Sequence, residues 1–200
     1  MYILSEIFLD LDHPVVRRDL ANRYYIHKTF SKMFSEYDKV KDYIVFYVQD
    51  VGSIPQVTIR SPLEPDWRQL PKGYLLSEPK VEVIEEILEP DKVYHFTWHC
   101  HCATSKNRNG KDCRPIKDDK EKISWVEDQG NRNGFTPFNF HLAYTEEITF
   151  QKKGLKEVKH YMATFKGFVT IDDIEEFQKK SAKGIGKGRG YGGGLFLLKP

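Results

Sequence analysis

The chain has 200 residues, of which 40% are apolar and 14% aromatic, so it can supply the core of one large domain or of two small ones. Its 31 Lys and Arg barely exceed its 29 Asp and Glu, and with a net charge of +2 any nucleic-acid binding must depend on local basic patches. The sequence has no run of about 18 apolar residues, which excludes a membrane-spanning helix.

The N-terminal residues and the cysteines indicate the cellular compartment. The segment MYILSEIFLDLD carries acids where a secretory signal needs a basic region, so it is interpreted as a first strand. There are three cysteines, two of them at Cys100 and Cys102, and this is not the pattern of a disulfide framework. We therefore expect a protein of the reducing cytoplasm.

The first half of the chain begins with a predicted strand and a helical region in two pieces. A short, apolar-rich strand is expected over residues 2–11, and the helical region begins at Pro14. Asn22 is a suitable N-cap for the second piece, because its side chain can accept from the first free amides. An apolar stripe with helical spacing follows this cap and predicts the buried face: Ile26, Phe30, Met33, Phe34 and Tyr37.

A polar stripe lies beside the apolar one on the same predicted helix. Tyr24, His27 and Ser31 follow one another at i, i+3 and i+7, and Lys28 and Lys32 lie next to them in the sequence. Histidine can accept or donate a proton near neutral pH, and lysine can stabilise a developing negative charge. Taken alone, the histidine is more simply explained as a surface residue next to a core stripe.

The remainder of the first half predicts strands over residues 43–49 and 56–60, joined by a turn that contains Gly52. Prolines and a glycine then indicate irregular chain, and residues 81–88 form either a strand or a short helix. The order strand, helix, strand, strand favours a ferredoxin-like unit whose second helix is eroded.

The second half, which begins after Pro90, repeats this order. Its predicted elements are a strand (92–103), a polar basic loop (104–111), a helix (118–131), two long strands (138–150 and 158–171) around a basic hairpin turn, a helix capped by Asp172 (172–182) and a last strand (195–198). The sequence therefore predicts an α+β fold of two tandem ferredoxin-like domains, 1–90 and 91–200, with a C-terminal glycine-rich loop between the last helix and the last strand.

Histidines and cysteines cluster in the strand at residues 92–103, where HCHC raises the question of a zinc site. The side chains concerned are His99, Cys100, His101, Cys102 and, further along, Cys113. Successive strand residues face opposite sides, so the two histidines point away from the two cysteines and four ligands cannot converge. We expect structural roles for them and no bound metal.

The last eighteen residues, KGIGKGRGYGGGLFLLKP, hold seven of the fourteen glycines, with Lys183, Lys187 and Arg189 among them. Glycines beside cations predict a backbone that approaches an anion such as phosphate, whereas the simple alternative is a flexible C-terminal loop. A G-x-G-x-x-G match runs from Gly188 to Gly193, but a dinucleotide loop follows a strand and opens a helix. Here that order is reversed, which disfavours an enzyme that binds a small nucleotide.

Four stretches in the same order resemble the CasE family, the endoribonuclease subunit of the CRISPR Cascade complex. They are RRDLANRYYIHKTF (17–30), GKDCRPIKDDKEKISWVEDQGNRNGF (110–135), FKGF (165–168) and the glycine-rich ending (184–198). The resemblance implies two RRM-like domains and metal-independent cleavage, without a cofactor, of precursor CRISPR RNA on the 3′ side of the repeat stem-loop. It also implies that the cut guide stays bound with other Cascade subunits. The alternative is a non-catalytic guide-binding subunit on the same fold.

The resemblance also assigns roles to individual residues. The expected catalytic group is His27 as general acid or base, Tyr24 to orient the phosphate or assist proton transfer, and Lys28 and Lys32 to stabilise the transition state. The expected RNA-binding residues lie near this catalytic group or belong to the basic loop, the basic hairpin and the glycine-rich segment. They are Arg17, Arg23, Ser31, Lys106, Arg108, Lys152, Lys153, Lys156, Lys159, Lys187 and Arg189.

Overall fold

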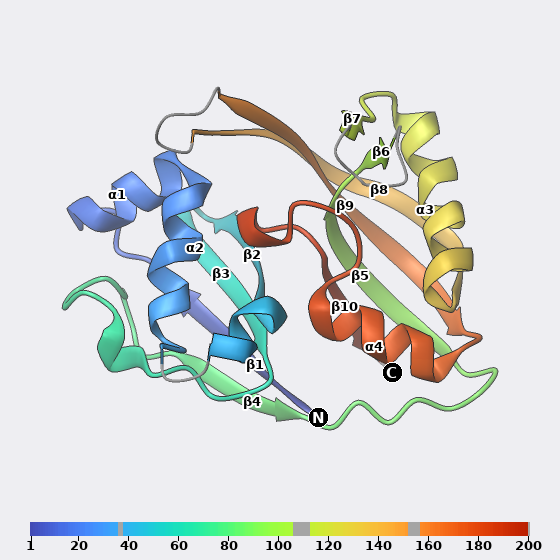
Figure 1. Cartoon of the computed structure of the whole chain (residues 1–200), viewed down its shortest axis with the longest axis horizontal. Helices are drawn as coiled ribbons and strands as arrows, with labels where there is room; N and C mark the ends of the chain where they lie inside the picture. Colours follow the sequence, from blue (N-terminus) through green and yellow to red (C-terminus); the bar gives the residue numbers. More distant parts are fainter. Residues whose placement is uncertain (36–37, 106–112, 152–156, 200) are drawn as a thin grey trace. The chain divides into compact units, whose positions relative to one another are not determined.

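Two four-stranded sheets form the framework of the chain, as Figure 1 shows. The computed structural model describes residues 1–35, 38–105, 113–151 and 157–199. The chain divides into two units. The first contains Met1–Glu86, Thr149–Val158 and Gly190–Gly192, and the second contains Ile87–Ile148, Lys159–Arg189 and Gly193–Pro200. The limits 1–90 and 91–200 that the sequence predicts for the two domains stay a prediction.

The first unit has the strand order of a ferredoxin-like fold. Its sheet is ordered β2-β3-β1-β4, with β1 antiparallel to both of its neighbours. The strands are β1 (Tyr2–Phe8), β2 (Val45–Val51), β3 (Ile54–Ser61) and β4 (Lys80–Ile84), and the helices are α1 (Pro14–Ala21), α2 (Arg23–Lys32) and the 3-10 turns η1 (Asp38–Tyr43) and η2 (Trp67–Gln69). The 3-10 turn η2 stands where a second helix is expected, which is the predicted erosion.

The apolar stripe of α2 packs on this sheet as its spacing predicts. Ile26 and Phe30 are fully buried, and the Phe30 ring meets Phe46 of β2 edge-on at 5.4 Å between centroids. Met33 and Phe34 continue the stripe and are also buried, whereas Tyr37 lies outside the described residues. Burial of this stripe fixes the rotation of α2 about its axis and therefore which side chains point away from the core.

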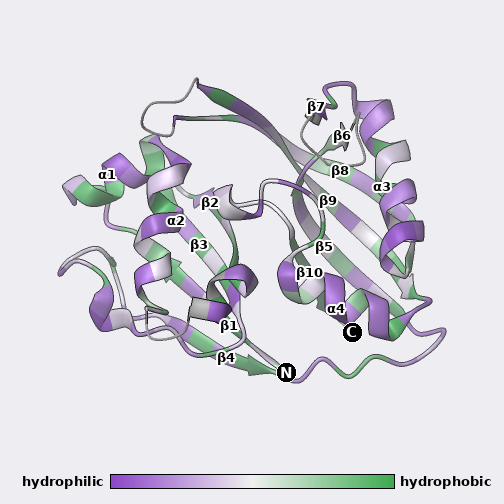
Figure 2. Ribbon diagram, in the orientation of Figure 1, coloured by the Kyte–Doolittle hydropathy of each residue, from purple (hydrophilic) through white to green (hydrophobic). Residues whose placement is uncertain are grey.

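The second unit repeats the strand order, so the prediction of two ferredoxin-like domains is confirmed. Its sheet is ordered β10-β5-β9-β8. The elements are β5 (Val93–His101), a small hairpin of β6 (Ala103–Ser105) and β7 (Cys113–Pro115), α3 (Asp119–Asn133), β8 (Phe135–Phe150), β9 (Val158–Ile171), α4 (Ile174–Lys183), η3 (Arg189–Tyr191) and β10 (Leu195–Lys199). In Figure 2, β5, α3 and α4 each mix hydrophilic and hydrophobic residues, as expected for elements with one face on a core.

The cap of α4 differs from the prediction by one residue. Asp173 is the N-cap, and its carboxylate accepts from the Glu176 amide at 2.9 Å. Asp172 instead accepts from the Thr136 hydroxyl at 2.6 Å. The predicted cap is therefore wrong by one residue, because the carboxylate of Asp172 is engaged with Thr136 and that of Asp173 reaches the helix amide.

Trp98 of β5 is the centre of the second core and holds the glycine-rich segment. Its ring stacks on Trp125 of α3 at 5.2 Å, and its indole N–H donates to the Ile185 carbonyl at 3.1 Å. The Gly194 amide donates to the His99 carbonyl at 2.6 Å. Gly194 has a φ of +91°, and a Cβ there would lie 2.9 Å from Cγ of Arg189, so this position requires glycine. The segment is therefore hydrogen-bonded into the second unit at both ends and is not a free C-terminal loop.

The histidines and cysteines of β5 alternate as predicted. The thiols of Cys100 and Cys102 lie 3.9 Å apart within the apolar core, and burial raises the pKa of Cys100. On the other side, His99 Nδ1 lies 2.7 Å from the Thr164 hydroxyl and the His101 ring stacks on His160. Within the described ranges, no three His, Cys, Asp or Glu side chains are grouped to hold a metal ion. None of the described helices is long and apolar enough to cross a membrane.

Candidate active site on helix α2

Asn22 sets the start of α2. Its backbone, at φ −144° and ψ 100°, ends α1 and begins α2, and its side-chain oxygen accepts from the Tyr24 amide at 3.2 Å. The Asn22 amide group also donates to the Gln151 carbonyl at 2.9 Å. One residue thus caps the helix and ties it to the chain that leaves β8.

A buried carboxylate joins α1 to α2. Asp19 is fully buried and accepts from the Thr29 hydroxyl of α2 at 2.6 Å and from the Tyr74 hydroxyl at 3.0 Å. Its other oxygen pairs with Arg18 at 2.6 Å, and the Arg18 guanidinium lies over the Tyr25 ring. Burial, reinforced by the Asp19 charge, raises the pKa of Tyr74, so its hydroxyl remains a donor. Two helices and a loop therefore converge on one acceptor.

His27 lies on the polar side of α2, partly buried. Burial lowers the pKa of its imidazole below the ordinary 6.5, so the ring is largely neutral at pH 7. Its Nδ1 is buried and has no hydrogen-bond partner among the described residues. Gly190 lies against the ring: a Cβ placed on it would be 3.8 Å from Cγ and Cδ2 of His27.

Two tyrosines belong to the same unit as His27. Tyr24 lies one turn earlier on α2, and the Lys28 ammonium lies 5.5 Å from the centroid of its ring. Tyr191 follows Gly190, and its ring stacks on Phe150 with 3.8 Å between centroids. Burial, and then the neighbouring Tyr24, raise the pKa of Tyr191. The predicted catalytic residues Tyr24, His27 and Lys28 therefore lie in one place, and Lys32 is exposed one turn beyond Lys28.

Some predicted RNA-binding residues of the first unit already make internal contacts. Arg17 donates to the carbonyls of Leu11 and Asp12 at 3.0 and 2.8 Å, and so holds the loop before α1. The Ser31 hydroxyl donates to the His27 carbonyl at 2.8 Å within the helix. Arg23 is the first residue of α2 and is partly buried. For all three, RNA binding stays a prediction.

The predicted RNA-binding residues of the second unit are likewise engaged where the structure describes them. Lys159 pairs with Glu147 across β8 and β9 at 2.5 Å. Arg189 donates to the Lys183 carbonyl at 3.0 Å, and the Lys187 carbonyl accepts from the His101 amide at 3.4 Å. The predicted residues of the basic loop and hairpin lie outside the described residues: Lys106, Arg108, Lys152, Lys153 and Lys156.

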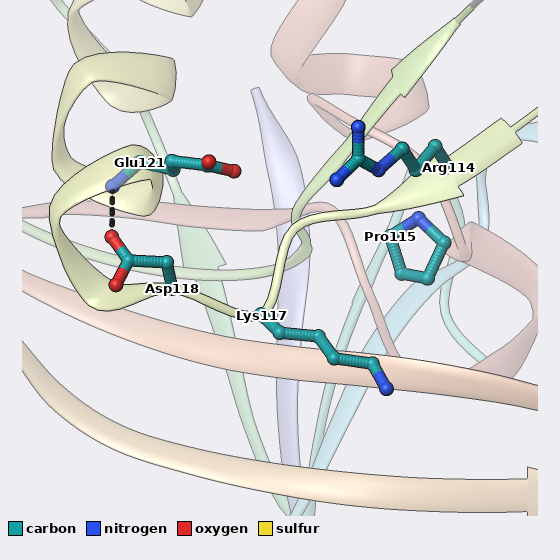
Figure 3. A pocket seen from close by; sticks show the side chains of 5 residues that line it. All are labelled: Arg114, Pro115, Lys117, Asp118 and Glu121. Carbon is teal, nitrogen blue, oxygen red and sulfur yellow. Dashed lines mark hydrogen bonds between the residues drawn. The ribbon is translucent and has the colours of Figure 1, made fainter.

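A surface hollow at the start of α3 also combines cations with a helix terminus. Figure 3 shows Arg114, Lys117, Asp118 and Glu121 around it, with the Asp118 carboxylate accepting from the Glu121 amide at 3.0 Å. Its two cations face two carboxylates, so the lining has no excess charge with which to select an anion. We assign it no part in the site.

Three residues at the site are not predicted by the sequence. The residues next to Asp19 in the sequence form no recognisable motif, and only the burial of its carboxylate in the structure indicates that it positions α2. Gly190 and Tyr191 belong to the glycine-rich segment, but the position of Gly190 near a helix more than 150 residues earlier has no local signal in the sequence. The tyrosine among the glycines was the available clue, because a large aromatic in such a segment must pack somewhere.

Comparison with known proteins identifies the family. A family model described as "CRISPR associated protein" matches residues 1–200. The chain belongs to this family. Over 98% of its length it is 26% identical to a protein of Thermus thermophilus named CRISPR-associated endoribonuclease Cse3, of which the match covers 99%. These matches confirm the resemblance to the CasE family.

Solved structures of this CRISPR-associated family have the same fold. A Thermus thermophilus Cse3 structure, bound to an RNA that represents a pre-cleavage complex, matches with a TM-score of 0.85 and 24% identity, covering 100% of this chain and 99% of that one. A chain of a CRISPR RNA-guided surveillance complex in a pre-nicking state matches with a TM-score of 0.68 and 16% identity, with 98% of each chain covered.

Proposed function

We propose that this protein is an endoribonuclease that cuts precursor CRISPR RNA at the 3′ base of the repeat stem-loop. The observation that carries the proposal is His27, a largely neutral and partly buried imidazole, placed with Tyr24 and Lys28 on one helix of a CRISPR-associated protein. A relative that matches nearly the whole chain is named an endoribonuclease. A non-catalytic guide-binding subunit would have no need of this arrangement.

The RNA supplies its own nucleophile. The 2′-hydroxyl oxygen forms a bond to the adjacent phosphorus while the bond from phosphorus to the 5′-oxygen breaks, leaving a 2′,3′-cyclic phosphate and a 5′-hydroxyl. Neutral His27 takes the proton of the 2′-hydroxyl through Nε2, and a water molecule supplies the proton that the departing 5′-oxygen gains. Tyr24 orients the phosphate, and Lys28 and Lys32 offset the negative charge that gathers on its oxygens.

The RNA and the other Cascade subunits are the proposed partners, in the cytoplasm. A relative has been solved with a pre-cleavage RNA, and another solved match belongs to an RNA-guided surveillance complex. The cationic residues of the basic loop and hairpin are proposed to bind phosphates of the stem, because A-form RNA hides its base edges in a deep groove. The cut guide then stays bound.

The proposal predicts that one deoxy substitution in the RNA stops cleavage. A repeat hairpin with a 2′-deoxy nucleotide before the scissile phosphate should bind normally and remain intact, because it lacks the nucleophile. The unmodified hairpin should be cut at one position, at the same rate in EDTA as in magnesium. Cleavage is measured on end-labelled RNA in single turnover. Cutting of the deoxy RNA, or a requirement for added metal, would overturn the mechanism.

The acidity of His27 predicts the pH dependence. A base acts when unprotonated, so kcat/KM should rise with pH up to the pKa of His27 in the free enzyme and level off above it. Because burial lowers this pKa, the half-maximal point should lie below pH 6.5. The measurement is kcat/KM between pH 4.5 and 8. A rate that falls as pH rises through this range would make His27 the acid instead.

A further inference from the structure

The tip of the glycine-rich segment is part of the first unit and packs beside the proposed catalytic histidine. Gly190 lies near the His27 ring, since a Cβ placed on it would be 3.8 Å from Cγ of that ring, and a Cβ placed on Gly192 would lie 3.5 Å from Cε2 of Phe46 in the core. Tyr191 stands between these two glycines. The residue before Tyr191 therefore lies close to the imidazole, and the residue after it lies close to a buried ring.

Tyr191 forms the outer layer of a two-ring stack. Its ring lies nearly parallel to that of Phe150, at 17° and with 3.8 Å between centroids. Phe150 is 5% exposed, whereas Tyr191 is partly exposed. The base of the stack is itself held, because the next residue, Gln151, accepts a hydrogen bond from Asn22 at the start of α2. The result is a stacked aromatic pair whose outer ring is one residue along the chain from the glycine that lies near His27.

The proposed reaction creates a need for such a surface. Attack by the 2′-hydroxyl requires that it lie in line with the bond to the 5′-oxygen, and the sugar conformation of a stacked A-form strand does not provide this alignment. The nucleotide must rotate, and its base then loses its neighbours in the RNA. Aromatic side chains replace such lost contacts, since every base has a face that can stack on them.

We propose that Tyr191, supported by Phe150, is the stacking platform for the nucleobase next to the scissile phosphate. The inference rests on the proposed function, because it takes His27 as the position of that phosphate. The platform role also accounts for the glycines that flank Tyr191, because they allow the chain to place this aromatic residue near the histidine. Tyr191 then holds the nucleotide in the geometry that in-line attack requires.

Removal of the base from the RNA tests the platform directly. Tyr191→Leu should slow single-turnover cleavage of intact RNA by about tenfold, the usual effect of losing one base–aromatic stack. On an RNA that is abasic at the nucleotide on one side of the scissile phosphate, the same variant should have no further effect. Tyr191→Phe keeps the ring and should cut like the wild type. Tyr144→Leu, which removes a 55% exposed tyrosine of β8, is the matched control.

The outcomes separate a platform from other roles. A loss that is equal on intact RNA and on both abasic RNAs would make Tyr191 a structural residue and overturn the inference. A loss as large in Tyr191→Phe as in Tyr191→Leu would assign the effect to the hydroxyl beside Tyr24 and would also overturn it.

A binding measurement makes the inference independent of cleavage. With 2-aminopurine at the same position of the 2′-deoxy hairpin, the wild type should quench its fluorescence and Tyr191→Leu should not. Quenching without cleavage of unmodified RNA would support the platform while the proposed function fails. Equal fluorescence with wild type and Tyr191→Leu would overturn the platform.

Discussion

Replacement of His27 by alanine should reduce the single-turnover rate of RNA cleavage by about 10²–10⁴-fold, the usual contribution of a general acid or base. RNA affinity should stay unchanged, because a neutral imidazole contributes no charge to phosphate binding. The fold should also survive, since the ring is only partly buried and the apolar stripe of α2 is untouched. Cleavage and filter binding on the same repeat hairpin give both quantities.

A matched histidine and a modified leaving group sharpen this test. His141→Ala removes an exposed histidine of β8 and should cut RNA at the wild-type rate. An RNA whose 5′-bridging oxygen is sulfur has a leaving group that needs no proton. If His27 is the base, His27→Ala should remain slow on this RNA. Restoration of the rate by sulfur would show that His27 is the acid, and undiminished cleavage of ordinary RNA would remove it from the mechanism.

The fold and the face of α2 could be predicted because both depend on signals that are local in the sequence. The spacing of Ile26 and Phe30 fixes which side of α2 is buried, and therefore places Tyr24, His27 and Lys28 on the open side. The repeated order of strands and helices is likewise a property of consecutive segments. Each such inference needs no knowledge of which distant residues meet.

The parts that could not be predicted depend on pairings between distant segments. RNA binding by Lys159 stays a prediction, whereas its ion pair with Glu147 depends on the register of β8 and β9. Phosphate contacts by the cations of the glycine-rich tip stay a prediction, whereas the position of Gly190 near His27 and the stacking of Tyr191 on Phe150 follow from packing between distant segments. Cross-strand register and loop packing decide both cases, and neither is encoded by spacing along the chain.

Asp19→Asn should lower the free energy of unfolding of the first unit by about 1.5–3 kcal/mol, the cost of losing a buried hydrogen bond to a charged group. The carboxylate accepts from the Thr29 and Tyr74 hydroxyls through one oxygen and from Arg18 through the other. An asparagine has a single acceptor oxygen, so it cannot serve both sides. Urea unfolding of Asp19→Asn is compared with that of Asp12→Asn, which makes the same charge change at an exposed position.

A double-mutant cycle tests whether the three side chains act together. In a Tyr74→Phe background one of the competing donors is gone, so Asp19→Asn should cost less than in the wild type, by about 0.5–3 kcal/mol if the pair is coupled. Strictly additive losses would show that Asp19 and Tyr74 are independent and that the network has no cooperative role.

The same substitution should slow cleavage without weakening RNA binding, because Asp19 acts on the position of α2. Thr29 is two residues after His27, and its bond to Asp19 holds the middle of the helix against α1. A looser helix moves the imidazole away from Gly190 and from the phosphate, whereas the cations that bind RNA keep their charge. Hydrogen exchange of the α2 amides should therefore increase in proportion to the loss of rate. A slower enzyme with unchanged α2 exchange would mean that Asp19 affects the reaction by some other route.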